Sequence, residues 1–258
     1  MVDDPAQRGP SPFGKRASWL PPSWRVERLD TVDSTNRWVL ERARSGAAEG
    51  LVAVADFQSA GRGRRGRTWI APPGSSLLVS VLLTPPHPAS ELHVVASAAG
   101  LALRDAVARW GIPAGLKWPN DVVVHDRKLA GLLAESEASG GRQLVVVGIG
   151  CNLRAGDAWP PEIAATATAC DRETDQPVER DQLLDALLDA LSDRLGDLDA
   201  VAPAYRDALV TRGRRVRAET DRGTVEGVAR DVDDRGRLIV ETAGERRVLD
   251  VADVVHLR

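Results

Sequence analysis

Cysteine, lysine and long apolar runs are all scarce in this sequence. Its 258 residues include only two cysteines, Cys151 and Cys170, and neither belongs to a CxxC pattern. A disulfide framework or a zinc site is therefore not expected. The longest apolar run, residues 77–84, is too short to cross a bilayer, and the first residues carry no secretion signal. These absences predict a protein of the reducing cytoplasm with no membrane partner.

The charge balance excludes bulk nucleic-acid binding as the simplest function. The formal net charge is -3 and the pI is about 5.9, whereas nucleic-acid-binding domains are usually basic. Of the 34 basic residues, only Lys15, Lys117 and Lys128 are lysines, and the others are arginines. A lysine is a compact point charge that arginine does not replace at a tight anionic site. Lys117 and Lys128, which lie close together in the sequence, therefore hint at such a site.

The sequence pattern divides the chain into three parts. Residues 1–23 hold five prolines and few large apolar side chains, so we expect a disordered leader. Residues 24–210 combine strands and helices, and several strands follow one another too closely for parallel crossovers. From residue 211 to 258 the apolar period changes to two, which is typical of a small β module. We expect an α+β fold, with a mixed, largely antiparallel sheet backed by helices.

Capping residues and apolar periodicity place the expected elements. Residues 154–178 show no regular pattern and are expected to be irregular. Strands are expected over 24–32, 51–57, 75–83, 115–118, 121–125, 128–136 and 143–147, and helices over 33–44, 89–110, 179–198 and up to about 209; the C-terminal strands are expected over 214–220, 224–229, 238–242 and 247–251.

An arginine- and glycine-rich stretch interrupts the expected sheet. QSAGRGRRGRTW, residues 58–69, holds four arginines and three glycines between two apolar strands. With the residues up to 74 it forms a connection that is long for a compact domain, which favours a functional loop. Guanidinium groups bind phosphate and carboxylate, and glycines let a backbone close over a ligand. We call residues 58–74 the arginine loop.

Four other motifs have ordinary explanations when each is taken alone. DSTN at 33–36 is typical of a helix cap, and the PND of KWPNDV at 117–122 is typical of a turn. RKLAGLLAE at 127–135 is an apolar strand, and the glycines of GIGCNL at 148–153 are weak evidence of a site. Singly, none of these motifs predicts a function.

Together and in this order, the five motifs resemble the biotin protein ligases, which attach biotin to a lysine of a carrier domain. GRGRRGRTW is similar to that family's biotinyl-adenylate loop, and the resemblance covers about residues 24–258. It implies a class II synthetase-like catalytic domain with a small C-terminal SH3-like β-barrel. Only 23 residues precede the first expected strand, so no DNA-binding domain and no DNA partner are expected.

The resemblance also implies the reaction and its partners. ATP, with Mg²⁺, would activate biotin as biotinyl-5′-AMP with release of pyrophosphate. Biotin would then pass to a lysine of the biotin carboxyl carrier protein domain of an acyl-CoA carboxylase such as acetyl-CoA carboxylase. The enzyme would be a monomer or a weak homodimer.

Residue roles follow from the same resemblance. Catalytic roles are implied for Lys128, Arg64 and Asp121, the last acting through Mg²⁺ or by orienting a lysine. No covalent nucleophile is expected. The implied biotin ligands are Ser34, Thr35, Asn36, Gln58, Arg62, Gly63, Arg64 and Lys128, and the implied ligands of ATP and the adenylate are Gly61, Arg65, Arg67, Trp69, Lys117, Asn120, Gly131 and Asn152.

Two alternatives and two departures from the family pattern stay open. A lipoate ligase or octanoyl transferase belongs to the same superfamily, but the polar DSTN motif and Gln58 suit biotin's ureido ring better. A non-catalytic nucleic-acid-binding protein could instead use the arginine loop. Thr68 stands where relatives often have lysine, and AATATAC at 164–170 only loosely resembles the family's adenine-side loop.

Overall fold

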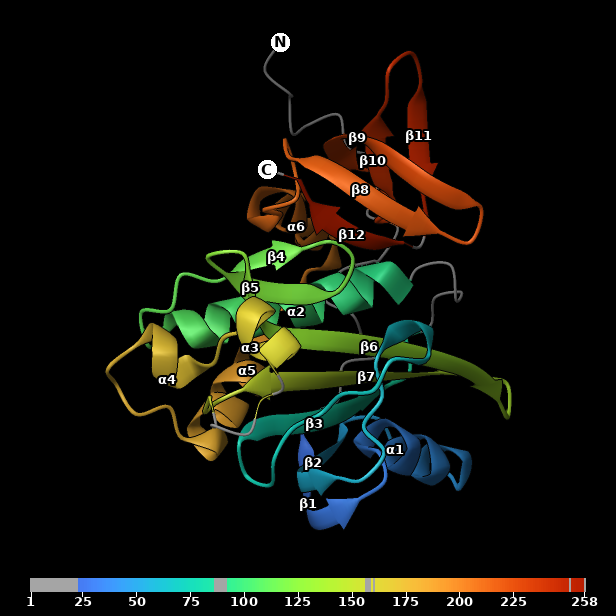
Figure 1. Cartoon of the computed structure of the whole chain (residues 1–258). Helices are drawn as coiled ribbons and strands as arrows, with labels where there is room; N and C mark the ends of the chain where they lie inside the picture. The colour runs from blue at the N-terminus through green and yellow to red at the C-terminus, as the bar shows by residue number, and fades with distance from the viewer. Residues whose placement is uncertain (1–22, 86–91, 156–158, 160, 251, 258) are drawn as a thin grey trace.

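A seven-stranded sheet forms the centre of the computed structural model, which describes residues 23–85, 92–155, 159, 161–250 and 252–257 (Figure 1). The strand order is β1-β2-β3-β7-β6-β5-β4. β1 pairs with β2 in parallel, and every other neighbouring pair is antiparallel, so the expected mixed sheet is confirmed. The strands are β1 (Arg25–Val32), β2 (Leu51–Gln58), β3 (Ser76–Leu83), β4 (Gly115–Lys117), β5 (Asp121–Val124), β6 (Arg127–Ser139) and β7 (Arg142–Asn152).

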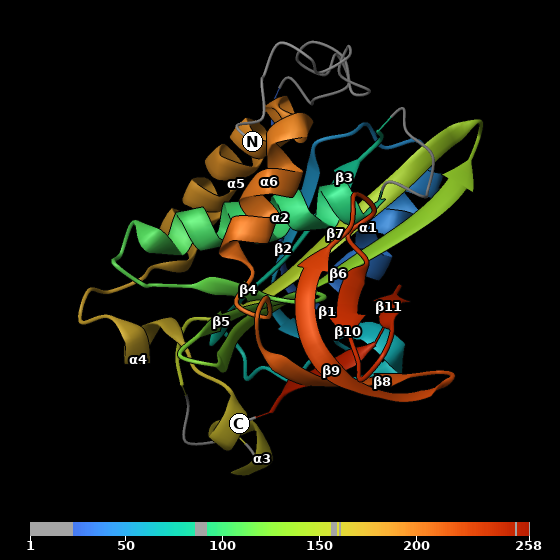
Figure 2. The ribbon, with the colours of Figure 1, turned by 90° about the horizontal axis from the view of Figure 1, so that it is seen from above.

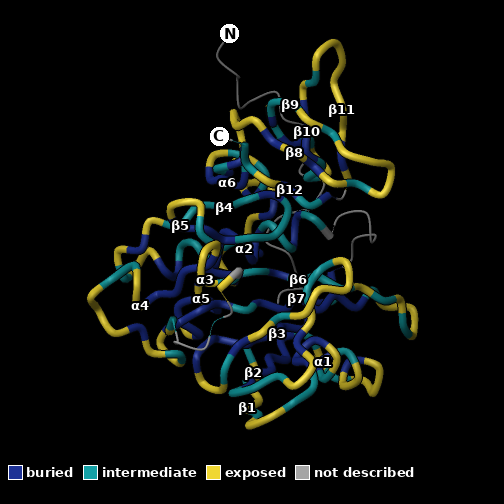
Figure 3. Tube along the Cα trace, in the orientation of Figure 1, coloured by how far each residue is buried: buried dark blue, intermediate teal, exposed yellow. Residues whose placement is uncertain are grey.

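Helices cover both faces of this sheet (Figure 2). α1 (Thr35–Arg44) connects the parallel strands and packs on one face, against Leu82, Leu144 and Val146. α2 (Leu92–Ala108), α5 (Arg180–Gly196) and α6 (Val201–Ala208) cover the other face. Because side chains alternate along a strand, the central strands are apolar on both sides. β3, for example, is buried at all eight of its residues (Figure 3).

The alternation of side chains along β7 also leaves space for a site on one face of the sheet. On β7, the side chains of Leu144 and Val146 fill the α1 face of the sheet, and the next two positions on that face are Gly148 and Gly150. Two glycines in succession leave the sheet bare there, beside the first turn of α1. A ligand or other side chains can therefore approach the backbone of β7.

The C-terminal residues form a second, five-stranded sheet in the order β11-β10-β9-β8-β12. All its pairs are antiparallel. Over the described residues the two outer strands do not pair, so the structure supports the expected β module but not a closed barrel. Its strands are β8 (Arg215–Thr220), β9 (Gly223–Val232), β10 (Leu238–Glu241), β11 (Arg246–Leu249) and β12 (Asp253–His256).

Three expectations differ from the structure. Residues 154–178 are not wholly irregular, because α3 (Pro161–Thr166) and α4 (Cys170–Glu173) lie there. The expected strands 128–136 and 143–147 are both longer, and β12 was not expected at all. The expected leader, apart from residue 23, and the start of the expected helix 89–110 lie outside the described residues. No helix in the described part of the chain is long and apolar enough to cross a membrane.

Candidate functional site

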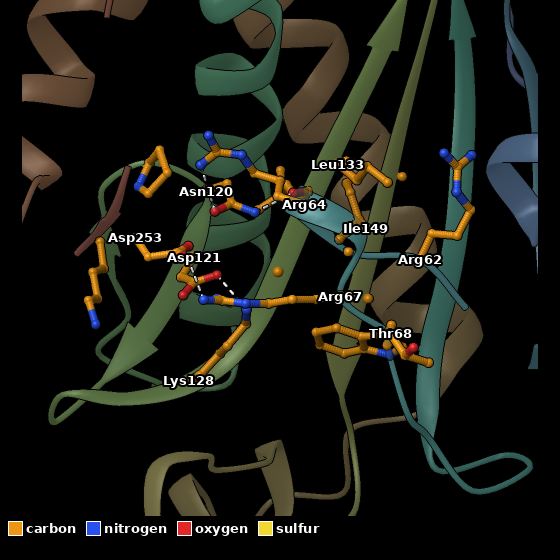
Figure 4. A pocket seen from close by; sticks show the side chains of 18 of the residues that line it. Arg62, Arg64, Arg67, Thr68, Asn120, Asp121, Lys128, Leu133, Ile149 and Asp253 are labelled. Atoms are coloured by element: carbon orange, nitrogen blue, oxygen red, sulfur yellow. Dashed lines mark hydrogen bonds and ion pairs between the residues drawn. The ribbon is translucent and has the colours of Figure 1, made fainter. Parts of the chain in front are cut away.

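A cavity of about 460 Å³ lies between the arginine loop and the bare part of the sheet (Figure 4). The first turn of α1, the β4–β5 connection, β6, β7 and β12 complete its wall. We call it the ligand cavity. All the site residues implied by the sequence line it, except Gly61, Arg65 and Asn152. The five motifs, which are spread over more than a hundred residues of sequence, therefore meet in one place.

Hydroxyl and amide groups form one end of the ligand cavity. Oε1 of Gln58 accepts hydrogen bonds from the backbone N–H and the hydroxyl of Thr35, at 2.8 and 3.0 Å. The hydroxyl of Ser80, on β3, lies 2.7 Å from Oγ1 of Thr35 and 2.6 Å from Oδ1 of Asn36. Ser80 is fully buried. These contacts hold a set of polar side chains in fixed orientations, and Ser80 is a site residue that the sequence motifs do not predict.

Glu135 connects this polar end to the arginine loop. Its carboxylate accepts a hydrogen bond of 2.8 Å from Nδ2 of Asn36 and lies 2.9 Å from Nη2 of Arg62. Glu135 stands in the RKLAGLLAE motif, but no site role was predicted for it. The available signal was that Glu135 is the single acidic side chain in this otherwise apolar and basic motif.

The position of Asn36 requires a glycine on the neighbouring strand. A Cβ atom at Gly148 would lie 2.1 Å from Oδ1 of Asn36, which is well inside van der Waals contact. Gly148 faces Ser80 across the β3–β7 pair. The glycine and the serine therefore shape the same side of the cavity, one by leaving room and the other by a hydrogen bond.

Positive charge gathers at the other end of the ligand cavity. Nζ of Lys128 lies 2.6 Å from Oδ1 of Asp121, so the two side chains form an ion pair. Their relative orientation does not suit a hydrogen bond, and this buried oxygen accepts none. Nη1 of Arg64 lies 3.4 Å from Oδ1 of Asn120, a long contact. Burial lowers the pKa of Arg64, and burial together with the charge of Lys128 lowers the pKa of Lys117. A bound anion would stabilise all three cations.

The remaining arginines of the loop are paired with protein carboxylates. Nη2 of Arg67 lies 2.5 Å from Oδ2 of Asp253 on β12. Arg65, with φ 55°, points outward and donates to Asp221 at 2.6 Å and to the backbone oxygen of Glu219 at 2.9 Å. Two ion pairs thus join the loop to the C-terminal sheet, and Arg64 is its one arginine without a carboxylate partner among the described residues.

Comparison with known proteins agrees with the motifs and the geometry. Residues 29–152 match the Biotin/lipoate A/B protein ligase family, and residues 211–257 match the Biotin protein ligase C terminal domain. The Biotin--[acetyl-CoA-carboxylase] ligase of Mycobacterium tuberculosis is 39% identical over 246 residues, which cover 91% of this chain and 90% of that protein. The chain belongs to the biotin protein ligase family.

Two further relatives support the assignment to the biotin protein ligases. The Biotin--[acetyl-CoA-carboxylase] ligase of Paracoccus denitrificans is 37% identical, over 88% of this chain and 98% of that protein. The structure of biotin protein ligase from Aquifex aeolicus in complex with biotin and ATP superposes with a TM-score of 0.78 and 26% identity. That match covers 90% of this chain and 99% of the other.

Trp69 closes the cavity of this biotin protein ligase family member from above β7. A Cβ atom at Gly150 would lie 2.5 Å from Cε2 of the indole, and one at Gly131 would lie 3.1 Å from Cζ3. Nζ of Lys128 lies 5.6 Å from the ring centroid, within the range of a cation–π contact. The indole N–H is buried and makes no hydrogen bond within the described residues. Trp69 therefore packs directly on the strand backbone at two glycines.

Three of the residues implied as adenylate ligands do not line the ligand cavity. Asn152 is buried, and its amide donates to the backbone oxygen of Thr168 at 3.0 Å. Gly61 is buried and accepts a hydrogen bond from the backbone N–H of Trp69 at 3.0 Å. Arg65 faces the C-terminal sheet, as described above. Their roles toward a nucleotide stay predictions, and the geometry gives Gly61 and Asn152 a positioning role in the loop and the α3 region.

The chain supplies few metal ligands of its own. No group of three or more His, Cys, Asp or Glu side chains that could hold a metal ion occurs within the described ranges. In the ligand cavity, Asp253 is paired with Arg67 and Asp121 with Lys128. One carboxylate together with substrate phosphates is a usual environment for Mg²⁺. The residues therefore fit a magnesium ion that arrives on a nucleotide, and a contact between that ion and Asp121 stays a prediction.

Proposed function

We propose that this protein is an ATP-dependent biotin–protein ligase. In the first step, biotin's carboxylate attacks the α-phosphorus of ATP, which gives biotinyl-5′-AMP and pyrophosphate. In the second step, a lysine amine of a biotin carboxyl carrier protein domain, such as that of acetyl-CoA carboxylase, takes the biotinyl group and AMP leaves. Residues 24–210 would form the catalytic part and residues 211–258 a C-terminal module.

One observation carries this proposal. A single cavity holds a buried set of neutral polar groups at one end and the cations Arg64, Lys117 and Lys128 at the other. Biotin has the matching polarity, because its ureido ring is neutral and rich in donors and acceptors while its carboxylate lies at the end of an apolar chain. A ligand placed with its ring at Thr35 and Asn36 brings its carboxylate toward the cations.

The cations would lower the barrier to the first step. Two anions, a carboxylate and a triphosphate, must be brought into contact, and negative charge builds up on the transferring phosphoryl group. Preorganised positive charges in a cavity shielded from water stabilise that charge without reorganising during the reaction. Arg64 and Lys128 would contact the reacting groups, and Lys117 and Asn120 the nucleotide phosphates. Magnesium bound to those phosphates would neutralise part of their charge.

The arginine loop would protect the product. A mixed anhydride hydrolyses in water, so an enzyme that makes one gains from a cover over the site. Arg67 and Arg65 fasten the loop to the C-terminal sheet, and Trp69 closes the cavity from inside. Biotinyl-AMP would then stay bound until the carrier arrives.

Partner, compartment and assembly are part of the same proposal. A carrier domain is the protein substrate to which the reaction leads. The two free and buried cysteines fit a reducing compartment such as the cytoplasm. A monomer or weak homodimer stays a prediction.

The proposed function is tested by comparing biotin and lipoate as substrates. The protein is incubated with ATP, Mg²⁺ and either biotin or lipoate, and pyrophosphate release and tightly held acyl-AMP are measured. We expect both products with biotin and neither with lipoate, because lipoate leaves the polar groups at Thr35 and Asn36 unpaired. Equal or greater activity with lipoate would favour a lipoate ligase, and no acyl-AMP with either acid would refute the proposal.

A further inference from the structure

A second cavity of about 480 Å³ lies beside the ligand cavity, against α2 and α6. We call it the side cavity. Seven residues line both cavities: Arg64, Lys117, Pro119, Asn120, Asp121, Leu132 and Leu133. The two cavities therefore adjoin at the cationic end of the ligand cavity, and we call these shared residues the wall.

Most of the side cavity is lined by apolar groups. Ala96 and Gly100 of α2 form one side, and Leu116 and Ala134 face them from the sheet. The small residues of α2 leave the space open, since larger side chains at these positions would fill it. The apolar part of this lining suits an aliphatic chain, and Arg64, Arg65, His93 and Lys117 add basic groups to it.

A tyrosine and an aspartate supply polar groups near each other in the side cavity. Tyr205 is only 7% exposed and lines the cavity, and its hydroxyl makes no hydrogen bond within the described part of the chain. Burial raises the pKa of Tyr205, so the phenol stays protonated. Asp121 is the one carboxylate among the described residues that line both cavities. An unpartnered hydroxyl beside a carboxylate suits a ligand group that donates hydrogen bonds.

The wall between the cavities is fixed on one side and loosely held on the other. Nδ2 of Asn120 donates to the backbone oxygen of Leu132 at 2.6 Å, which fixes the amide. Arg64 contacts Asn120 only at 3.4 Å and comes from the arginine loop. A shift of the Arg64 side chain toward an anion in the ligand cavity would therefore open the wall.

We propose that the side cavity is the passage through which the acceptor lysine of the carrier domain reaches the activated carboxyl group. The proposal rests on the proposed function, since it assigns a route to that function's second substrate. The apolar lining takes the four methylene groups of the lysine. Tyr205 and Asp121 receive its amine, opposite the end of the ligand cavity where the acyl carbon would lie.

The charges at the wall favour the reactive form of the amine. Arg64 and Lys117 repel an ammonium ion, so the lysine loses one proton to water at the mouth and arrives as a neutral amine. Its nitrogen then attacks the acyl carbon, the new C–N bond forms, and the bond from the acyl carbon to the phosphate oxygen breaks. AMP leaves with that electron pair, and the second amine proton passes to the phosphate of the departing AMP.

The test blocks the side cavity without changing the ligand cavity. Ala96 lines only the side cavity, so Ala96→Cys places a thiol there. The full chain is compared before and after alkylation with N-ethylmaleimide. Cys151 and Cys170 are fully buried, so the wild-type protein treated in the same way serves as the control. Two rates are measured: formation of biotinyl-AMP without carrier, and single-turnover transfer from preformed enzyme-bound biotinyl-AMP to a carrier domain.

Alkylation of Ala96→Cys should lower the transfer rate by about tenfold or more, since displacing a reactant by 1 Å can cost about 100-fold, and leave biotinyl-AMP formation unchanged. Unmodified Ala96→Cys should transfer biotin as the wild type does. The passage is refuted if alkylation leaves transfer unchanged, or if it slows adenylate formation as much as transfer. A wild-type protein that makes no biotinyl-AMP would refute the proposed function instead.

Discussion

The ammonium group of Lys128 lies 2.6 Å from Oδ1 of Asp121 and faces the indole of Trp69 on its other side, 5.6 Å from the ring centroid. The side chain is 37% exposed, so the charge sits at the edge of the ligand cavity rather than in the core. One of the three lysines of the chain is thus held between a carboxylate and an aromatic ring, where arginine, with its planar and longer head group, would not fit in the same way.

Replacing Lys128 by alanine should abolish measurable biotinyl-AMP formation. The change removes a positive charge from the site of reaction, and the loss of one such group lowers kcat by about 10²- to 10³-fold in other enzymes. Pyrophosphate release with saturating biotin and ATP measures the effect. Lys128→Arg, which keeps the charge but not its geometry, should retain part of the activity. Wild-type turnover in Lys128→Ala would show that this residue has been given the wrong role.

Alanine substitutions of two neighbouring arginines of the loop should have sharply different effects on kcat/KM. Arg64→Ala removes a buried cation that lines the ligand cavity, and we expect kcat/KM to fall by about 100-fold. Arg65→Ala removes a guanidinium group that faces Asp221 at the surface, where an ion pair contributes about 1 kcal/mol or less. Its kcat/KM should change by less than about fivefold. Equal losses in the two variants would mean that Arg65 turns into the ligand cavity when substrates bind.

Removing the hydroxyl of Ser80 should weaken biotin binding selectively. Ser80 orients Thr35 and Asn36 through contacts of 2.7 and 2.6 Å, and a buried hydrogen bond of this kind contributes about 1 kcal/mol. Ser80→Ala should raise the KM for biotin by about fivefold while the KM for ATP stays constant. Ser76→Ala is the matched control, because Ser76 is also buried on β3 but does not contact Thr35 or Asn36. A rise in both KM values would point to general loosening of the strand.

The pairing of strands that are distant in sequence explains why the sequence predicts the motifs but not all of the site. Glycines, arginines and lysines mark the ligand cavity because their chemistry is unusual at those positions. Ser80 looks like any serine in a strand, and its role appears only when the β3–β7 pairing sets it opposite Gly148. Likewise, the outward direction of Arg65 follows from its positive φ and from a carboxylate of the C-terminal sheet that is 156 residues away in sequence.

The failure to predict helices α3 and α4 from the sequence has a similar cause. Most of residues 154–178 are small or polar, and the few large apolar residues, such as Trp159 and Ile163, show no helical period, so the sequence predicts no helix there. α4 is instead held by contacts from outside itself, because the backbone N–H of Asp171 donates to Leu153 and its carboxylate accepts from the N–H of Ala155. The apolar strand β3 and the amphipathic helix α5, by contrast, carry their own pattern, and the sequence predicts both closely.

His256 should make the stability of the protein depend on pH. Its Nε2 lies 3.2 Å from Oγ1 of Thr211, and its Nδ1 lies 3.4 Å from Oδ1 of Asp126. The Thr211 hydroxyl also accepts the backbone N–H of Trp118 at 3.0 Å, so one network joins the C-terminal sheet to the KWPNDV motif. Burial, and then the nearby charge of Lys117, lower the pKa of His256.

Because the pKa of His256 is lowered in the folded protein, the stability of the protein should decrease as the pH falls. Because the folded pKa is below the unfolded value of about 6.5, the unfolded chain binds more protons as the pH falls below neutrality, and the folded state loses stability. The loss should begin as the pH passes below the unfolded pKa and level off below the folded pKa. The free energy of unfolding, measured by urea denaturation between pH 7.5 and 5, should fall less steeply in His256→Gln than in the wild type. His125→Gln, which changes an imidazole that is 72% exposed, serves as the control. Identical slopes for His256→Gln and the wild type would show that this histidine is not held in its neutral form by the fold.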